Sequence, residues 1–264
     1  MQNKTHPRRF VVVGDVHGQI GPFLNILRHA QLIDRFSNWC GGDARLLQIG
    51  DIIDRGLFSV QVDGILERLQ MQAPATGGEV IRLVGNHELE FILGNFSLSQ
   101  IPKDRQELFQ KKFIQNVKEG KMKAAYAYKG FLCTHAGVNR RLFQVFDRQL
   151  EDLSAANLAI LINLIFKESV AHQFYKHPIF NISLRRSGPN RFGGIFWEDL
   201  EDLITSFHQS PIWQIVGHTP LVNIVVDTQR QIIPVDVGLH RKQQYLEISD
   251  KGKPTIITVP AENQ

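Results

Sequence analysis

The sequence predicts a single α/β domain in which two β-sheets pack against each other. The first hundred residues alternate short, continuously apolar runs with amphipathic runs, as in a parallel sheet whose strands are joined by helices. The last part of the chain reads instead as paired strands with turns, which favours a second, more antiparallel sheet packed on the first. With 264 residues and 43% hydrophobic content, the chain can bury one sizeable core.

Three buried strands and two helices are expected in the first part of the chain. Strands are predicted where apolar residues run without interruption, and helices where they recur every three or four positions. The strands fall at residues 9–14, 45–50 and 79–85, and the helices at residues 22–33 and 59–71. This order is typical of strand–helix–strand units, whose strands lie parallel in one sheet.

The second half is predicted to mix helical insertions with further strands. Helical insertions are expected at residues 97–122 and 139–178. Strand regions are expected at residues 125–137 and 213–219, and hairpins at residues 223–238 and 244–259. No linker or repeat divides the chain, so residues 1–264 are expected to form one domain. We expect the insertions to wall the functional site.

The composition argues against several classes of protein. The net charge of +4 and the pI near 9.1 fit an anionic substrate or an ordinary solvated surface, and no block of Lys and Arg predicts a nucleic-acid partner. No apolar run reaches about 18 residues, so no membrane contact is expected. An apolar signal region is absent from the N-terminus, and Cys40 and Cys133 do not make a disulfide framework, so we expect a cytoplasmic protein. The sequence does not indicate an oligomeric state.

Polar side chains follow five apolar strands at the point where each strand ends. The carboxyl ends of parallel strands share one edge of a sheet, so we expect these side chains to meet there. In chain order they are Asp15 and His17, then Asp51, Asp54 and Arg55, then Asn86, His87 and Glu88, then His135, then His218. Of these, Glu88 opens a helix, and we expect it to interact with the helix N-terminus rather than to catalyse.

This combination of residue types predicts a metal centre. Carboxylate, carboxamide and imidazole groups are ligands for hard or borderline divalent cations, and no cysteine spacing of a structural zinc site is present. The donors suffice for two ions, and one carboxylate held between two strands could bridge them at about 3.5–4 Å, as in two-metal phosphoester chemistry. In such a site a water molecule between the ions loses a proton near neutral pH and attacks phosphorus.

The motifs around these residues resemble those of a known family. "GDVHG", "GDIIDRG" and "GNHE", followed by single histidines in "HAG" and "GHT", are similar to the phosphoprotein phosphatase (PPP) family of calcineurin-like metallophosphoesterases. The resemblance spans residues 14–219, and "VDVGL" after "GHTP" resembles its bacterial-type members. It implies an α/β sandwich of two sheets with helices on the outer faces.

The resemblance also implies a role for each residue. One metal ion would be held by Asp15, His17 and Asp51, and the other by Asp51, Asn86, His135 and His218, with Asp51 as the bridge. His87 and Asp54 correspond to the acid/base pair, His87 protonating the leaving oxygen, while Arg55 and Asn86 correspond to phosphate-binding residues. Such roles fit the chemistry, since a histidine held by a carboxylate is a good proton donor and an arginine fork matches two phosphate oxygens. Manganese is the ion expected first, with iron or zinc as alternatives.

Two regions depart from the family pattern. "GHTP" supplies only His218, where related branches have a second histidine, and this favours the phosphatase branch. "GIFWEDL" is not followed by the second phosphate-binding arginine of the eukaryotic members, so Arg185, Arg186 and Arg191 remain the candidates for that role. Asp236 and His240 are expected to be structural or peripheral.

Three functions are compatible with this sequence. The first is a metal-dependent phosphoester hydrolase similar to serine/threonine protein phosphatases, acting on a phosphorylated protein or a small phosphoester. The second is a symmetrical dinucleoside polyphosphate hydrolase of the Ap4A type, which uses a closely similar motif set. The third is a non-catalytic scaffold that binds metal, and the presence of Asp54 and His87 counts against it.

Overall fold

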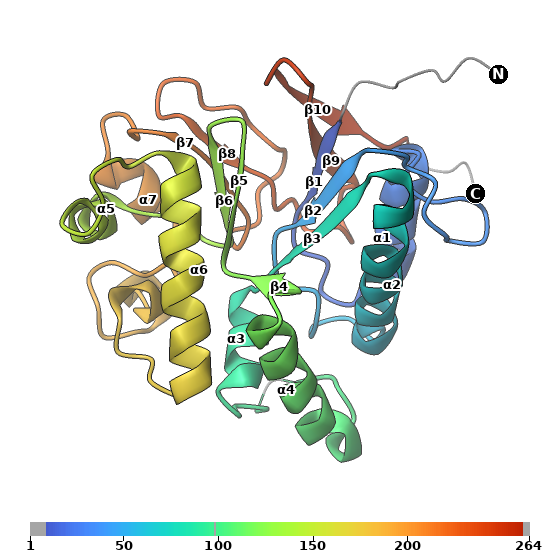
Figure 1. Ribbon diagram of the computed structural model, residues 1–264, viewed down its shortest axis with the longest axis horizontal. Coiled ribbons are helices and arrows are strands. Elements are labelled where there is room, and N and C mark those ends of the chain that lie inside the picture. The colour runs from blue at the N-terminus through green and yellow to red at the C-terminus, as the bar shows by residue number, and fades with distance from the viewer. Residues whose placement is uncertain (1–8, 98, 261–264) are drawn as a thin grey trace.

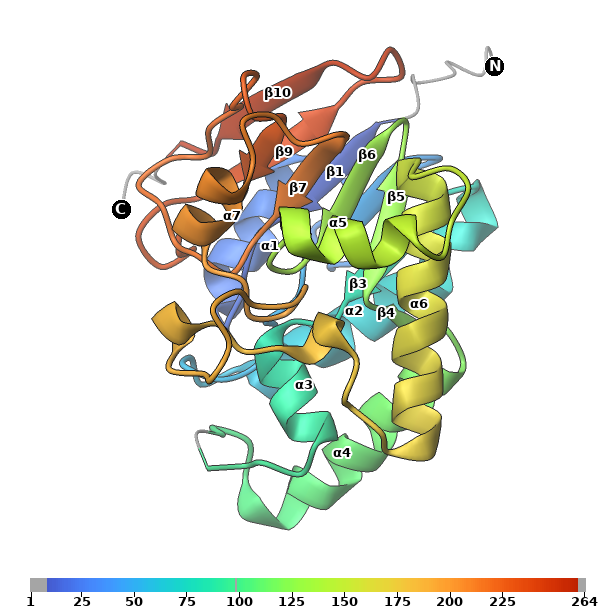
Figure 2. The ribbon, with the colours of Figure 1, turned by 90° about the vertical axis from the view of Figure 1, so that its left-hand side faces the viewer.

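Two β-sheets face each other, and helices cover their outer faces (Figures 1 and 2). The computed structural model describes residues 9–97 and 99–260. Within them, one sheet has six strands in the order β10-β9-β1-β2-β3-β4, and the other has four in the order β5-β6-β7-β8. The two-sheet α/β fold predicted from the sequence is therefore confirmed.

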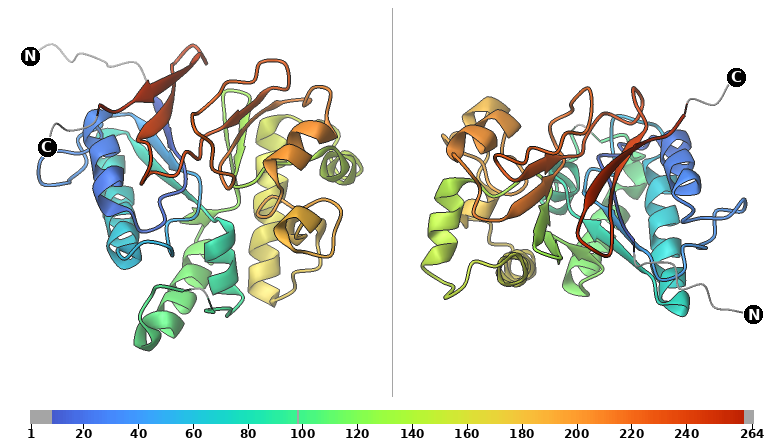
Figure 3. Two further views of the ribbon diagram at one scale, coloured as in Figure 1. Left: turned by 180° about the vertical axis from the view of Figure 1, so that it is seen from behind. Right: turned by 90° about the horizontal axis from the view of Figure 1, so that it is seen from above.

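The centre of the larger sheet is parallel. It consists of β1 (Phe10–Val13), β2 (Arg45–Gln48) and β3 (Glu79–Leu83), and the short β4 (Met122–Lys123) extends it. The helices α1 (Ile20–His29) and α2 (Ser59–Gln72) lie on its outer face, as Figure 3 also shows, and the 3-10 turn η1 (Ala73–Thr76) follows α2. All three central strands occur where the apolar runs predict them.

Successive residues of these strands point to opposite faces of the sheet, and both faces are buried. Val11 and Leu46 pack with the helices, whereas Val12 and Leu47 pack into the layer between the sheets. This double burial explains why the runs are continuously apolar instead of alternating.

The smaller sheet is mostly parallel. It contains β5 (Ala125–Tyr128), β6 (Phe131–Thr134), β7 (Trp213–Val216) and β8 (Ile232–Pro234), and only the β5–β6 pair is antiparallel. The last two strands, β9 (Gln244–Ile248) and β10 (Pro254–Thr258), form the predicted hairpin but join the larger sheet, where β9 pairs antiparallel with β1. The second sheet comes mainly from the C-terminal half of the chain, as expected, but the expectation that it is the more antiparallel sheet is wrong.

Helices form in both of the segments predicted as helical insertions. The first contains α4 (Lys103–Lys118), which follows α3 (Asn86–Ile92), and both lie below the sheets in Figure 1. In the second, α5 (Arg140–Asp147) and α6 (Ala155–His172) lie with α7 (Leu200–Ser206) outside the smaller sheet. The 3-10 turns η2 (Pro178–Phe180) and η3 (Leu184–Arg186) connect α6 to α7.

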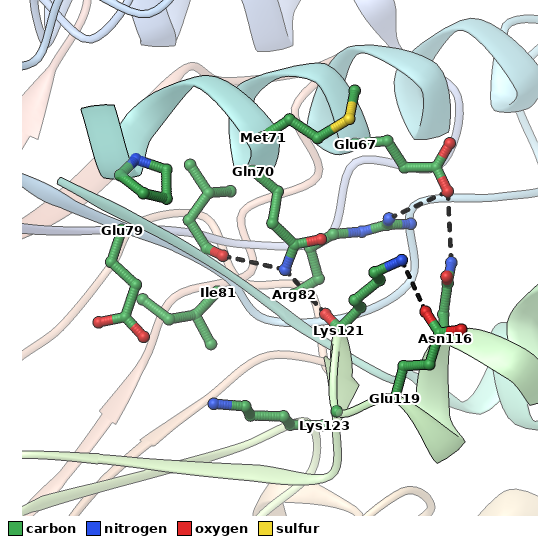
Figure 4. A pocket seen from close by; sticks show the side chains of 13 residues that line it. Glu67, Gln70, Met71, Glu79, Ile81, Arg82, Asn116, Glu119, Lys121 and Lys123 are labelled. Carbon is green, nitrogen blue, oxygen red and sulfur yellow. Dashed lines mark hydrogen bonds and ion pairs between the residues drawn. The ribbon is translucent and has the colours of Figure 1, made fainter. Parts of the chain in front are cut away.

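A buried group of charges joins α2, β3 and α4. Arg82 of β3 is 1% exposed and donates to Asp63 of α2, which also pairs with Lys112 of α4. Glu67 lies 2.7 Å from Lys112 and 3.7 Å from Arg82. Glu67 and Arg82 line a hollow of about 530 Å³, in which Figure 4 shows Arg82 pointing towards Glu67. Two cations and two carboxylates offset each other here, as buried charges require.

None of the helices in the described residues is both long and apolar enough to span a bilayer.

Candidate metal centre

The turns that follow the strands meet between the two sheets, and their backbone is strained. His17, Asp51, Asp54, Arg55 and His218 all have φ between 47° and 67°, the left-handed region that L side chains rarely adopt. Such strain persists only where the surroundings fix it, and it is common at functional sites. The polar turns at the strand ends are therefore held in a left-handed backbone conformation by their surroundings.

Glycines before the turns allow close approach. A Cβ at Gly85 would lie 2.1 Å from Oδ1 of Asp51, and one at Gly217 would lie 2.5 Å from Oδ1 of Asp15. Only glycine fits where these carboxylates touch the backbone of a neighbouring strand end.

Asp51 lies at the middle of the site. Its Oδ2 is 3.6 Å from Nε2 of His17 on one side and 3.5 Å from Nε2 of His135 on the other. The side chain is 1% exposed, and its Oδ1 accepts the backbone N–H of His87 at 3.0 Å. One carboxylate is thus within reach of ligands from both sheets, as expected for a bridging residue.

Asn86, His135 and His218 gather on the side of the smaller sheet. Nε2 of His135 lies 3.0 Å from Oδ1 of Asn86 and 3.2 Å from Nδ1 of His218. Asp51, His135 and His218 each offer a ligand atom within 4.8 Å of the others. All four residues predicted for the second ion are therefore together.

Asp15 and His17 lie on the other side of Asp51. Nε2 of His17 is 3.9 Å from Oδ2 of Asp15, whose Oδ1 accepts the backbone N–H of His218 at 3.1 Å. The ring of His87 also approaches, since His17, Asp51 and His87 offer atoms within 4.8 Å of one another. The geometry therefore admits His87 as a ligand as well as the predicted Asp15.

The residues present fit divalent metal ions. Oδ2 of Asp15 and Nε2 of both His17 and His218 are buried without a hydrogen-bond partner, a costly state for polar atoms. In His17 and His135 the Nδ1 atom lies 3.0–3.1 Å from a backbone carbonyl, which directs the Nε2 lone pair into the site. Orphaned donors of these types around a shared carboxylate are what a metal centre requires.

The electrostatics agree with a centre completed by cations. Burial and the nearby carboxylates of Asp236 and Asp51 raise the pKa of Asp15 well above its usual value. Burial lowers the pKa of His17 to about 4 and also holds the pKa of His218 well below its usual range, so both rings are neutral. Metal ions bind neutral imidazoles and ionised carboxylates, and a nearby cation favours the ionised form of Asp15.

His87 and Asp54 form a pair beside these residues. Nδ1 of His87 is 2.8 Å from Oδ2 of Asp54, whose Oδ1 accepts the backbone N–H of Gln100 at 3.2 Å. Burial lowers the pKa of His87, but the carboxylates of Asp51 and Asp54 outweigh it and raise that pKa above its usual value. A raised pKa and a fixed Nδ1 suit a proton donor that acts through Nε2.

A pocket of about 550 Å³ opens over the pair and contains two arginines, Arg55 and Arg186. Arg186 contacts Thr219 at 2.5 Å and Asp199 at 3.0 Å, and its Nε is buried without a partner. Arg185 instead pairs with Asp202 and Glu201 on α7, and Arg191 stacks on Phe192 away from this pocket. Of the three candidates left open by the sequence, Arg186 is the one at the site.

Two acidic residues interact with the predicted metal ligands more closely than the sequence indicates. Glu88 is fully buried and accepts the backbone N–H groups of Asp51, Ile52, Ile53 and Gly85 at 2.7–3.2 Å. Asp236 is 2% exposed and acts electrostatically on Asp15, whereas His240 is exposed. Only the position of Glu88, two residues after Asn86, could have indicated its contact with the Asp51 turn.

Comparison with known proteins supports a common family. The family described as calcineurin-like phosphoesterase matches residues 8–232. Shewanella-like protein phosphatase 2 of Arabidopsis thaliana is 37% identical over 90 residues, which are 34% of this chain and 23% of that protein. Shewanella-like protein phosphatase 1 of Plasmodium berghei is 31% identical over 137 residues, which are 52% of this chain and 34% of that protein. The matched segments thus span 23% and 34% of the length of these relatives.

The fold has a counterpart among solved structures. The cold-active protein-tyrosine phosphatase of a psychrophilic Shewanella species superposes with a TM-score of 0.63 at 19% identity, over 97% of this chain and 81% of the other. This likeness shows the fold, and the family match covers most of the sequence together with the strand ends that carry Asp15, Asp51, Asn86, His135 and His218. The chain therefore belongs to the calcineurin-like phosphoesterase family.

Proposed function

We propose that this protein is a phosphatase that hydrolyses phosphate monoesters of proteins or small molecules with two divalent metal ions. The observation that carries the proposal is Asp51, a buried carboxylate within 3.6 Å of histidines from both sheets and next to an acid/base pair. The relatives named above are protein phosphatases, which supports a phosphoprotein as the substrate.

Each group has a distinct part in the proposed reaction. Asp15, His17 and Asp51 would hold one ion, and Asp51, Asn86, His135 and His218 the other. Two such ions lower the pKa of a water molecule and neutralise phosphoryl charge. Arg55 and Arg186 bind and orient the phosphate oxygens, as two guanidinium forks in one pocket can. His87 protonates the leaving oxygen through Nε2, and Asp54 holds its ring. Manganese is the proposed metal, with iron or zinc as alternatives, since oxygen and nitrogen ligands suit all three.

The charge of the pocket favours a single phosphate over a polyphosphate. Among its described lining residues, Arg55 and Arg186 are the only lysine or arginine side chains, and Glu90 adds a carboxylate. A dinucleoside polyphosphate carries several phosphate charges, which would need more cations along the cleft. The Ap4A-type hydrolase therefore remains the second candidate.

A comparison of three substrates tests the proposal. The purified protein with Mn²⁺ is assayed on p-nitrophenyl phosphate, a phosphothreonine peptide and diadenosine tetraphosphate, with Asp51→Asn as the matched inactive control. We expect hydrolysis of the first two substrates and loss of both metal and activity in the variant. Activity on the dinucleotide alone would select the second candidate, and inactivity with every substrate and metal would indicate a scaffold.

The cytoplasm remains the proposed location. Cys40 and Cys133 are both free thiols, one exposed and one buried, as is usual in a reducing compartment.

A further inference from the structure

Gln48, the last residue of β2, has a fully buried side chain that bonds to the backbone at two strand ends. Its Oε1 accepts the N–H of Gly50 at 3.0 Å, and its Nε2 donates to the carbonyl of the same glycine at 2.5 Å. The Nε2 atom also lies 3.5 Å from the carbonyl of Gly14, at the end of β1. The amide therefore completes the hydrogen bonding of Gly50 and ties together the turns that carry Asp15 and Asp51.

The remaining backbone groups of the Asp51 turn are also bonded. Glu88 accepts the N–H groups of residues 51–53, and the carbonyl of Asp51 accepts those of Val16 and His17. Gly50 itself has φ 107°, and a Cβ there would lie 2.5 Å from the nitrogen of Gly85. The side chains of Gln48 and Glu88 thus hold the left-handed backbone before Asp51 from its two sides. The backbone hydrogen bonds of this turn are made without any contact to a metal ion.

We infer that Gln48 is a positioning residue, which fixes the shared ligand Asp51 and its neighbour Asp15 in their metal-binding arrangement before any ion binds. The inference rests on the proposed function, since it assigns Gln48 a part in the same metal centre. Groups that orient metal ligands typically contribute about 10- to 100-fold to metal affinity, because the ligands otherwise have to be ordered when the ion binds.

The smaller sheet offers a matched control. Gln214 of β7 is also fully buried, and its amide makes the same pair of bonds to one residue, Val138, whose N–H it accepts at 2.8 Å and to whose carbonyl it donates at 3.0 Å. Val138 follows the bend at His135 and Ala136 and lies three residues after the ligand His135, whereas Gly50 directly precedes the ligand Asp51. Gln214→Met therefore removes an equivalent buried amide, and Gln48→Met removes the one at the metal centre.

The test is a calorimetric titration of Mn²⁺ into the metal-free wild type, Gln48→Met and Gln214→Met, with melting temperatures recorded alongside. We expect the dissociation constant to rise about 10- to 100-fold in Gln48→Met and to stay near the wild-type value in Gln214→Met. Equal affinity in all three proteins, or equal losses in both variants, would overturn the role of Gln48. A wild type that binds no divalent ion would instead contradict the proposed function itself.

Hydrogen exchange gives a second measurement that needs no variant to fold. In the wild type with excess chelator, we expect the Gly50 amide to exchange slowly, as does the core of β2. Rapid exchange of Gly50 that becomes slow only when Mn²⁺ is added would show that the ions, and not Gln48, order the turn.

Discussion

At the scale of single residues, the site depends on how each side chain is held. His87 illustrates this, because its ring has two potential roles. Its Nδ1 is engaged by Asp54 at 2.8 Å, and its ring also offers a ligand atom within 4.8 Å of one on His17 and one on Asp51. Removing the ring distinguishes the two roles, because loss of a proton donor lowers turnover, whereas loss of a ligand lowers the metal content.

We predict that His87→Ala retains its metal and loses turnover. General acid catalysis contributes about 10²- to 10⁴-fold, so kcat should fall by that factor while metal content per chain is unchanged. The backbone N–H of His87, which bonds Asp51 at 3.0 Å, is kept in the variant. Metal analysis of the purified variant checks this, and loss of an ion would identify His87 as a ligand.

Glu198 permits a second prediction, on the pH dependence of stability. This fully buried carboxylate accepts a bond from Asn139, and its Oε1 is buried without a partner. Burial raises its pKa from 4.5 to about 7. Between these values the folded protein retains a proton that the unfolded chain releases, so this contribution to stability falls as the pH rises and is absent above pH 7.

Glu198→Gln should therefore stabilise the protein at pH 8 and change little at pH 5. The neutral amide avoids ionisation in the interior, and the gain at high pH is of the order of 3 kcal/mol. Urea denaturation at both pH values measures it, with the exposed Glu168→Gln as the control. The same effect at both pH values would show that Glu198 is already neutral, or ionised at no cost, in the wild type.

At the scale of elements, the sequence predicts where strands form better than it predicts which strands pair with one another. The apolar runs of β1, β2 and β3 determine both the strands and the polar turns after them, because a strand buried on both faces must end where polar residues begin. The hairpin of β9 and β10 is equally visible, yet it pairs with β1 and not with the smaller sheet. Pairing between distant segments depends on tertiary packing, which local patterns do not contain.

The buried charges between α2, β3 and α4 yield a prediction at this scale. Arg82→Met leaves the buried Asp63 and the partly exposed Glu67 to share Lys112, so Asp63 loses one of its two cationic partners. Breaking a buried pair in this way costs about 3–5 kcal/mol. Arg45→Met, on the neighbouring strand, removes an ion pair to Glu79 that is about one third exposed and should cost less than about 1 kcal/mol.

Urea denaturation of both variants compares the two losses of unfolding free energy. A loss for Arg82→Met as small as that for Arg45→Met would mean that the charges are solvated or compensated elsewhere.

At the scale of the whole molecule, the two sheets are joined by their shared site. The larger sheet contributes Asp15, His17, Asp51 and Asn86, and the smaller one contributes His135 and His218. Their convergence could be predicted because each follows an apolar strand. The choice of Arg186 among three arginines and the bonds of Gln48 could not, since both depend on contacts between segments far apart in the chain.

The most direct test of the account is a crystal structure of the protein grown with Mn²⁺, with the ions located by anomalous scattering. We predict two manganese peaks in each chain, one on either side of Asp51, with its carboxylate bound to both. A single peak, or peaks that Asp51 does not contact, would contradict the central claim that this carboxylate bridges two ions between the sheets.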